Sequence, residues 1–127
     1  MTIIVSGTGI AGMSAALAAA NVGHKVTLCG HLASLPPAGG IQLAPNGWRA
    51  LDQLGLFDAA IKRATRLNHI VVRDLDSGAT LTRLGLDNHY GSIGRADLLD
   101  LLQGTVAKHR AITHHPALIS QAVPHKD

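Results

Sequence analysis

The chain has 127 residues, of which 46% are hydrophobic and 15% are charged, so it is globular and long enough for one domain at most. Its formal net charge of +3 is modest, and its lysine and arginine residues are scattered along the sequence. Scattered cations, together with aromatic side chains limited to Trp48, Phe57 and Tyr90, argue against a nucleic-acid partner.

The same sequence argues against a membrane protein. No apolar stretch approaches the roughly 20 residues that span a bilayer, and the N-terminus lacks the basic segment of a signal peptide. Cys29 is the only cysteine, so no internal disulfide forms, and we expect a reducing, cytoplasmic compartment. Because Cys29 ends an apolar stretch, we interpret it as a small buried hydrophobe rather than a reactive thiol.

The first elements expected are a strand at Ile3–Val5 and an alanine-rich helix at Met13–Ala20. The strand is wholly apolar, which predicts burial on both faces, as in a parallel sheet. A second strand, Lys25–Cys29, follows the helix end at Asn21–His24. The chain therefore begins as a strand–helix–strand unit of an α/β fold.

Glycines at the strand–helix junction have the spacing G-x-G-x-x-G, which in this context indicates a dinucleotide-binding turn. Gly7 lets the chain leave the strand sharply, Gly9 has no Cβ to block a diphosphate, and Gly12 lets helix and strand pack closely. The unpaired amides of Ile10, Ala11 and Gly12 at the helix start would then bind the phosphates. No cationic side chain is required.

The middle of the chain is less regular. The stretch His31–Gly40 is rich in proline and glycine and is expected to be a loop. Ile41–Asn46 is expected to be extended, with Asn46 capping a helix that continues to Leu54, and Phe57–Thr65 reads as another short helix. A hairpin is expected from the strand-like His69–Leu75 and Thr80–Leu84.

The hairpin interrupts the alternation of strands and helices, so we expect residues 66–90 to be an excursion towards a substrate domain. The segment Gly91–Asp97 then introduces a leucine-rich helix that runs to about Arg110. Ala111–His114 is expected to be a further strand, and Leu118–Ile119 a short one.

Three segments resemble the amino-terminal part of the FAD-dependent aromatic-ring monooxygenases, flavoproteins similar to salicylate and para-hydroxybenzoate hydroxylase. The segments are the glycine turn, the stretch Gly40–Leu56 (GIQLAPNGWRALDQLGL) and the stretch Ile93–Leu99 (IGRADLL). The resemblance implies a Rossmann-like FAD/NAD(P)-binding fold with a parallel sheet, incomplete here, plus a β-hairpin from a partial substrate domain. It also implies FAD as cofactor, NADH or NADPH as electron donor, O2 as co-substrate and an aromatic small molecule as substrate.

Within this resemblance, Arg95 corresponds to an arginine that touches the cofactor. The alternative for Arg95 is a surface ion pair with Asp97 or Asp100, which would contribute only about 0 to 1 kcal/mol. The cofactor carries the chemistry in such enzymes, so we name no catalytic residue.

The sequence departs from the family's pattern at the end of the second strand. An acidic residue that binds the adenosine ribose is expected there, but this chain has Gly30, followed by His31. Loss of the charge-assisted hydrogen bonds predicts an affinity for FAD lower by about ten- to a hundredfold. His31 could alternatively face a 2′-phosphate, which would point to NADPH.

The family's later half has no counterpart in the chain, so residues 1–127 read as a single, truncated FAD-binding domain that is not active alone. We expect exposed edges to favour self-association or a complementary chain. One alternative is a non-catalytic nucleotide-binding or interaction module derived from the fold, and another is a small NAD(P)-linked reductase.

The eight histidines raise the question of a metal site, particularly His114 and His115 together with His109 and His125. Neighbouring residues on a strand point to opposite faces, and no Cys or Glu is near to complete a ligand set. We therefore expect these histidines to be ordinary surface residues and expect no metal.

Overall fold

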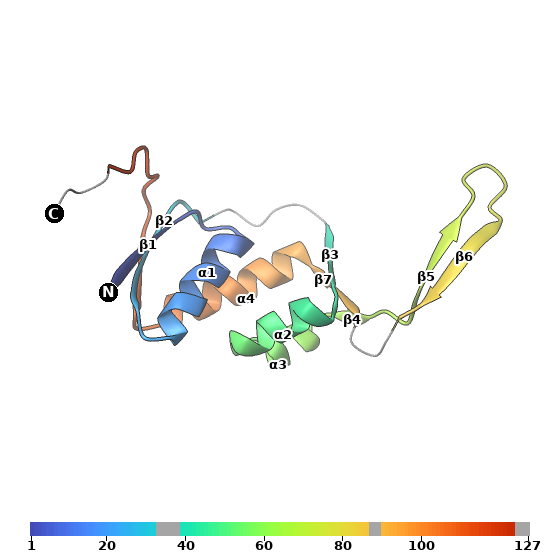
Figure 1. The fold of residues 1–127 in the computed structure, drawn as a ribbon, viewed down its shortest axis with the longest axis horizontal. Helices are drawn as coiled ribbons and strands as arrows, with labels where there is room; N and C mark the ends of the chain where they lie inside the picture. Colours follow the sequence, from blue (N-terminus) through green and yellow to red (C-terminus); the bar gives the residue numbers. More distant parts are fainter. Residues whose placement is uncertain (33–38, 87–89, 124–127) are drawn as a thin grey trace. The chain divides into compact units, whose positions relative to one another are not determined.

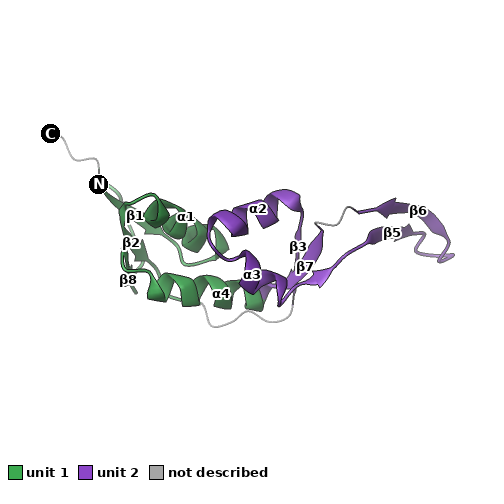
Figure 2. Ribbon diagram, turned by 90° about the horizontal axis from the view of Figure 1, so that it is seen from below, with its two compact units in different colours: residues 1–37, 96–127 green, residues 38–95 purple. Residues whose placement is uncertain are grey.

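The structure is a computed structural model, and it describes residues 1–32, 39–86 and 90–123. These residues form two compact units, shown in Figure 2. The first unit contains residues 1–37 and 96–127, and the second contains residues 38–95. Most of the loop predicted at His31–Gly40, including its proline pair, lies outside the described residues.

The first unit is built on a three-stranded parallel sheet of order β1-β2-β8. Its strands are β1 (Thr2–Ser6), β2 (Lys25–Cys29) and β8 (Ile112–His115), and its helices are α1 (Ile10–Asn21) and α4 (Arg95–Lys108). Both helices lie on the same side of the strands (Figure 1). This arrangement confirms the predicted α/β fold and its parallel sheet.

The sheet is covered on one face and open on the other, which corrects the prediction that β1 is buried on both faces. The covered core includes Met13 and Leu17 of α1 and Leu28 of β2, all of which are almost completely buried. Ile4, on the opposite face of β1, is 65% exposed. Cys29 is a free, buried cysteine, which confirms its interpretation as a small core residue.

The second unit contains an antiparallel sheet of order β3-β7-β4 together with two short helices. In chain order its elements are β3 (Gly40–Leu43), α2 (Pro45–Gln53), α3 (Phe57–Ile61), β4 (Thr65–Arg66), β5 (His69–Arg73), β6 (Thr80–Gly85) and β7 (Gly91–Gly94). Its core side chains include Leu43, Trp48, Leu51 and Ile93.

Several predicted element boundaries in the second unit are wrong. Helix α2 begins at Pro45 after an Ala44 cap, so Asn46 lies inside the helix. Proline suits this first position because its fixed φ is already helical and its missing N–H has no intrahelical partner there. Helix α3 ends at Ile61 rather than Thr65, because Thr65 and the residue after it pair with β7.

The lead-in to α4 also differs from the prediction. Gly91–Gly94 forms strand β7, which pairs with both β3 and β4, and the helix itself starts at Arg95. No strand forms at Leu118–Ile119. Among the described residues, no helix combines the length and apolar character needed to cross a membrane.

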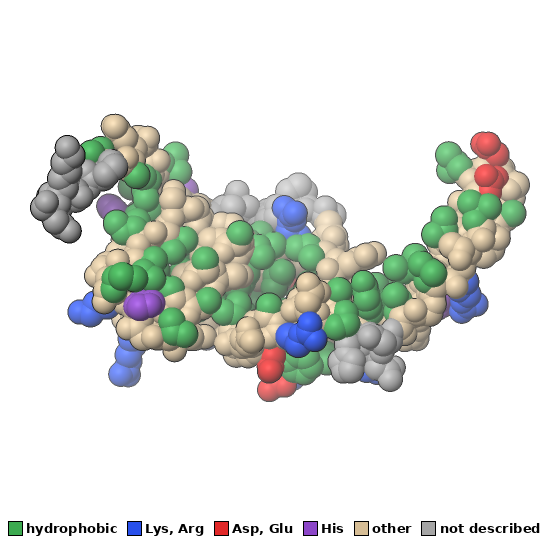
Figure 3. Space-filling view, in the orientation of Figure 1, with side chains coloured by type: hydrophobic (Ala, Val, Ile, Leu, Met, Phe, Trp, Pro, Cys, Tyr) green, Lys and Arg blue, Asp and Glu red, His purple; other side chains and the backbone are tan. Residues whose placement is uncertain are grey.

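The predicted hairpin is confirmed as β5 and β6, which pair antiparallel with a register shift between Val72 and Arg73. All six residues of β6 are exposed. Hydrophobic side chains follow the hairpin in Figure 3, and acidic side chains lie at its tip. The tip is held by Asp74, whose Oδ1 accepts hydrogen bonds from the Ser77 amide (2.8 Å) and hydroxyl (2.6 Å).

Candidate functional site

The glycine turn connects β1 to α1 through a close approach of two backbone segments. The amide of Gly7 donates to the Cys29 carbonyl oxygen at 2.8 Å, and the φ of Gly7 is +108°, a value that favours glycine. A Cβ placed on Gly12 would lie only 1.9 Å from the Gly7 carbonyl oxygen. Gly7 and Gly12 therefore have the structural roles that the sequence assigned to them.

Gly9 faces open space. A Cβ placed there would meet no atom within 4 Å. Gly9 is the N-cap of α1, and its carbonyl accepts the first helical hydrogen bond, from the Met13 amide at 3.0 Å. Within the described part of the chain, the amides of Ile10, Ala11 and Gly12 have no backbone or side-chain acceptor. These donors are left at the positive end of the α1 dipole, where a negatively charged group is stabilised.

The end of β2, beside the glycine turn, is closed by contacts that sequence reasoning missed. Thr8 is 7% exposed, and its hydroxyl donates to the His31 carbonyl oxygen at 2.5 Å. The ring nitrogen Nε2 of His114 lies 2.8 Å from the carbonyl oxygen of Gly30. The sequence signal for these contacts was Thr8, a polar residue between the first two glycines of the turn.

The remaining predicted site residues are His31 and Arg95. The side chain of His31 is exposed, two residues after the end of β2. Its carbonyl oxygen accepts the hydrogen bond from the Thr8 hydroxyl. Arg95 is exposed at the start of α4 and belongs to the second unit, where its amide donates to the Gly39 carbonyl oxygen at 2.8 Å. A cofactor contact by either side chain stays a prediction.

Three of the four histidines considered for a metal site, His109, His114 and His115, are among the described residues. His114 is half-buried and His115 is exposed, as expected for neighbours on a strand. The Nδ1 atom of His109 accepts a hydrogen bond from the Ala111 amide at 3.2 Å. His125 lies outside the described residues, and among those described no group of three or more His, Cys, Asp or Glu side chains could hold a metal ion.

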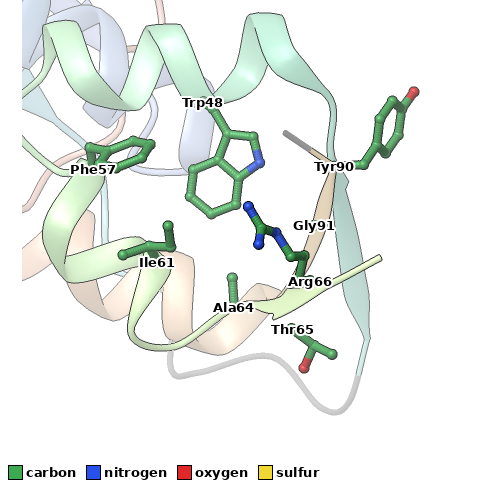
Figure 4. Close-up of a pocket in the computed structure, with 8 residues that line it drawn as sticks. All are labelled: Trp48, Phe57, Ile61, Ala64, Thr65, Arg66, Tyr90 and Gly91. Carbon is green, nitrogen blue, oxygen red and sulfur yellow. The ribbon is translucent and has the colours of Figure 1, made fainter. Parts of the chain in front are cut away.

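The second unit contains a separate cavity of about 380 Å³, which the sequence did not predict. Trp48 and Phe57 meet edge to face in its wall, with ring centroids 5.6 Å apart and an interplanar angle of 70°. In Figure 4 the indole of Trp48 faces Phe57 and Ile61, whereas the ring of Tyr90 points away from them. The lining is mostly apolar, although the Arg66 guanidinium points towards Trp48 in Figure 4, and the described lining residues include no carboxylate or histidine for acid–base chemistry.

Comparison with known sequences finds no matching family model. A 3-amino-4-hydroxybenzoate 2-monooxygenase of Streptomyces platensis is 39% identical over 122 residues, which cover 86% of this chain and 31% of that protein. A 3-hydroxybenzoate 6-hydroxylase of Polaromonas naphthalenivorans is 33% identical over 114 residues, covering 82% of this chain and 28% of that protein. The chain thus spans about a third of the length of the curated relatives that it matches.

Solved structures give the same fold. The tetrameric form of 2-methyl-3-hydroxypyridine-5-carboxylic acid oxygenase has a TM-score of 0.77 at 24% identity, covering 89% of this chain and 31% of that one. The p-nitrophenol 4-monooxygenase PnpA of Pseudomonas putida has a TM-score of 0.76 at 20% identity, covering 90% of this chain and 31% of that one. By sequence and fold, this chain is similar to the amino-terminal part of the FAD-dependent aromatic-ring monooxygenases.

Proposed function

We propose that this chain is the FAD-binding portion of a flavoprotein monooxygenase that hydroxylates an aromatic substrate with NAD(P)H and O2. The observation that carries the proposal is the open glycine turn, where Gly9 leaves space and the first amides of α1 have no acceptor among the residues that the structure describes. The relatives support the reaction class, since their names describe monooxygenases and hydroxylases of hydroxybenzoates.

The residues present fit the diphosphate of FAD. The open position at Gly9 gives the phosphates room beside the backbone, and the amides of Ile10, Ala11 and Gly12 are donors at the positive end of a helix. Gly7 and Gly12 set the geometry of this turn by their close packing. When bound, FAD supplies electron transfer from NAD(P)H and the activation of O2. The role of this chain is to bind and orient the cofactor.

Arg95 and His31 are the secondary cofactor contacts in this proposal. We propose that Arg95 binds the cofactor through its guanidinium, because a cation in the first turn of α4 opposes the helix dipole and gains from a nearby anion. We propose a weaker contact for His31, whose exposed side chain follows β2. Substituting Arg95→Ala is expected to reduce FAD affinity without changing the fold of the glycine turn.

Titration with FAD tests the proposal. We expect added FAD to shift its visible absorption bands, and the flavin to be retained through gel filtration at protein concentrations above the dissociation constant. A matched pair of variants localises the site: Gly9→Asp blocks the open position, whereas Gly104→Ala changes an exposed helix glycine whose Cβ meets nothing within 4 Å. Binding that is absent in the unaltered chain, or equal in both variants, would contradict the proposal.

A second candidate is a non-catalytic module that binds nucleotides through the same turn. The observation that favours it is Gly30, which leaves the end of β2 without the carboxylate expected to bind a ribose. Calorimetry with FAD and ADP separates the two candidates. Equal affinity for both ligands favours the module, whereas a clear preference for FAD, with its flavin contacts, favours the monooxygenase.

We infer a cytoplasmic protein from the single buried Cys29, because it forms no disulfide.

Association with a second copy or a complementary chain stays a prediction. We place this association on the open face of the β1-β2-β8 sheet, around Ile4. Sedimentation of the wild type and an Ile4→Lys variant would test it, since the variant is expected to be monomeric over a wider concentration range.

A further inference from the structure

Thr8 and Gly30 face each other closely beside the glycine turn. A Cβ placed on Gly30 would lie 3.1 Å from Thr8 Cγ2 and 3.3 Å from Thr8 Oγ1. The φ of Gly30 is +140°, a backbone conformation that residues with a side chain rarely adopt. Both the contact and the backbone angle therefore disfavour an acidic side chain at position 30.

The backbone groups of Gly30 and His31 also form hydrogen bonds within the protein. The Gly30 carbonyl oxygen is 2.8 Å from His114 Nε2, and the Gly30 amide donates to the His115 carbonyl oxygen at 3.0 Å. The His31 carbonyl oxygen accepts from the Thr8 hydroxyl at 2.5 Å. The Gly30 and His31 carbonyl oxygens thus each already have a protein donor.

No other carboxylate is close in sequence to replace the missing one. The first acidic residue of the chain is Asp52, which belongs to the second unit. In turns of this type, an acidic side chain at the end of the second strand accepts hydrogen bonds from the 2′-hydroxyl of the ribose. The chain has Gly30 at that position, and the Gly30 and His31 carbonyl oxygens each already have one protein partner.

We propose that Thr8 and Gly30 are a specificity-determining pair that makes the nucleotide site indifferent to the ribose 2′-hydroxyl. The ligand is held through its diphosphate, so ribonucleoside and 2′-deoxyribonucleoside diphosphates bind alike. This inference rests on the proposed nucleotide binding and defines which part of the nucleotide is recognised. Thr8 has two roles in this proposal. Its buried side chain fills the space beside Gly30, and its hydroxyl donates a hydrogen bond to the His31 carbonyl oxygen.

Calorimetric titration of the unaltered chain with ADP and with 2′-deoxy-ADP tests the inference. We expect the two dissociation constants to agree within about twofold, because no charged acceptor distinguishes the ligands. Weaker binding of 2′-deoxy-ADP by about tenfold or more would overturn the inference while leaving nucleotide binding in place. Failure to bind either ligand would overturn the proposed function, and the inference with it, so the two failures are distinguishable.

Variants test the pairing of the residues. Gly30→Asp is expected to lower the unfolding temperature more when Thr8 is present than in the Thr8→Ala background, because alanine removes the contacts at 3.1 and 3.3 Å. In the Thr8→Ala, Gly30→Asp double variant we expect ADP to be preferred over 2′-deoxy-ADP by about tenfold. If Gly30→Asp alone is as stable and as selective as the double variant, Thr8 does not close the position. The comparison of ligands on the unaltered chain remains decisive where a variant fails to fold.

Discussion

Each unit contains a glycine against which another group packs, but the groups differ. A Cβ on Gly12 in the first unit would lie 1.9 Å from the Gly7 carbonyl oxygen, whereas a Cβ on Gly91 in the second would lie 2.8 Å from Trp48 Cζ2. A backbone carbonyl between a strand and a helix cannot move without moving both elements. An aromatic side chain beside a cavity can rotate or shift. Glycine is therefore a strict requirement at position 12 of the glycine turn and a packing preference at position 91 of the second unit.

The largest effect is expected for Gly12→Ala. The added methyl group would force α1 away from β1, so we expect a loss of about 3 kcal/mol or more in the free energy of unfolding. Chemical denaturation followed by circular dichroism measures it. Gly104→Ala is the matched control, because its Cβ meets nothing and alanine favours an exposed helix interior by about 1 kcal/mol. Equal free energies of unfolding for Gly12→Ala and Gly104→Ala would contradict a strict requirement for glycine at position 12.

Gly9→Asp is expected to separate stability from binding. The Gly9 position is open, and an aspartate at an N-cap accepts hydrogen bonds from the next helical amides. We expect the free chain to gain a few tenths of a kcal/mol in stability, while FAD and ADP affinities fall by at least about tenfold because a carboxylate occupies the place of the diphosphate. Gly9→Ser, a neutral cap, should lose less affinity. Unchanged binding in Gly9→Asp would place the nucleotide elsewhere.

Gly91→Ala is expected to have an intermediate effect. The methyl group would press on the edge of the Trp48 ring and approach the Thr65 carbonyl oxygen at 3.3 Å, so we expect a loss of about 1 to 2 kcal/mol. Trp48 is the only tryptophan, so its fluorescence reports directly on this contact. A spectral shift without unfolding would show that the ring moves. A loss as large as that of Gly12→Ala would show that the second unit is equally rigid.

The smallest effect is expected at the hairpin tip. Hydrogen bonds from the Ser77 hydroxyl and amide hold the pKa of the exposed Asp74 carboxyl below its usual value of 3.8. Because the folded-state pKa lies below that of the unfolded chain, this contribution to turn stability is present at neutral pH and is lost as the pH falls through the folded-state pKa. Ser77→Ala is expected to raise the pKa of Asp74. An NMR titration of the Asp74 carboxyl that showed no change between wild type and variant would contradict this assignment.

The sequence predicted those elements whose pattern is local. The apolar run of Lys25–Cys29 and the alanine-rich helix before it needed only periodicity and composition, and both were confirmed. Strand β7 was missed because Gly91–Gly94 reads as a turn, and only its pairing with β3 and β4 makes it a strand. The end of α3 was wrong for the same reason, since Thr65 is drawn into that sheet.

The glycine turn was predicted because its spacing encodes its geometry, and the structure places Gly7, Gly9 and Gly12 as expected. The closure of the end of β2 could not be predicted in the same way. It depends on the φ of Gly30 and on its contact with Thr8, which lies on a different segment of the chain. A missing acidic residue was visible in the sequence, but the residue that fills its space was not.

The most direct test of nucleotide binding at the glycine turn is an amide-resolved NMR titration of the chain with ADP. We expect the largest shifts at the amides of Ile10, Ala11 and Gly12, the donors without an acceptor among the described residues. We also expect these shifts to disappear in Gly9→Asp. Shifts confined to residues around Trp48, or no shifts at saturating ADP, would contradict nucleotide binding at the glycine turn.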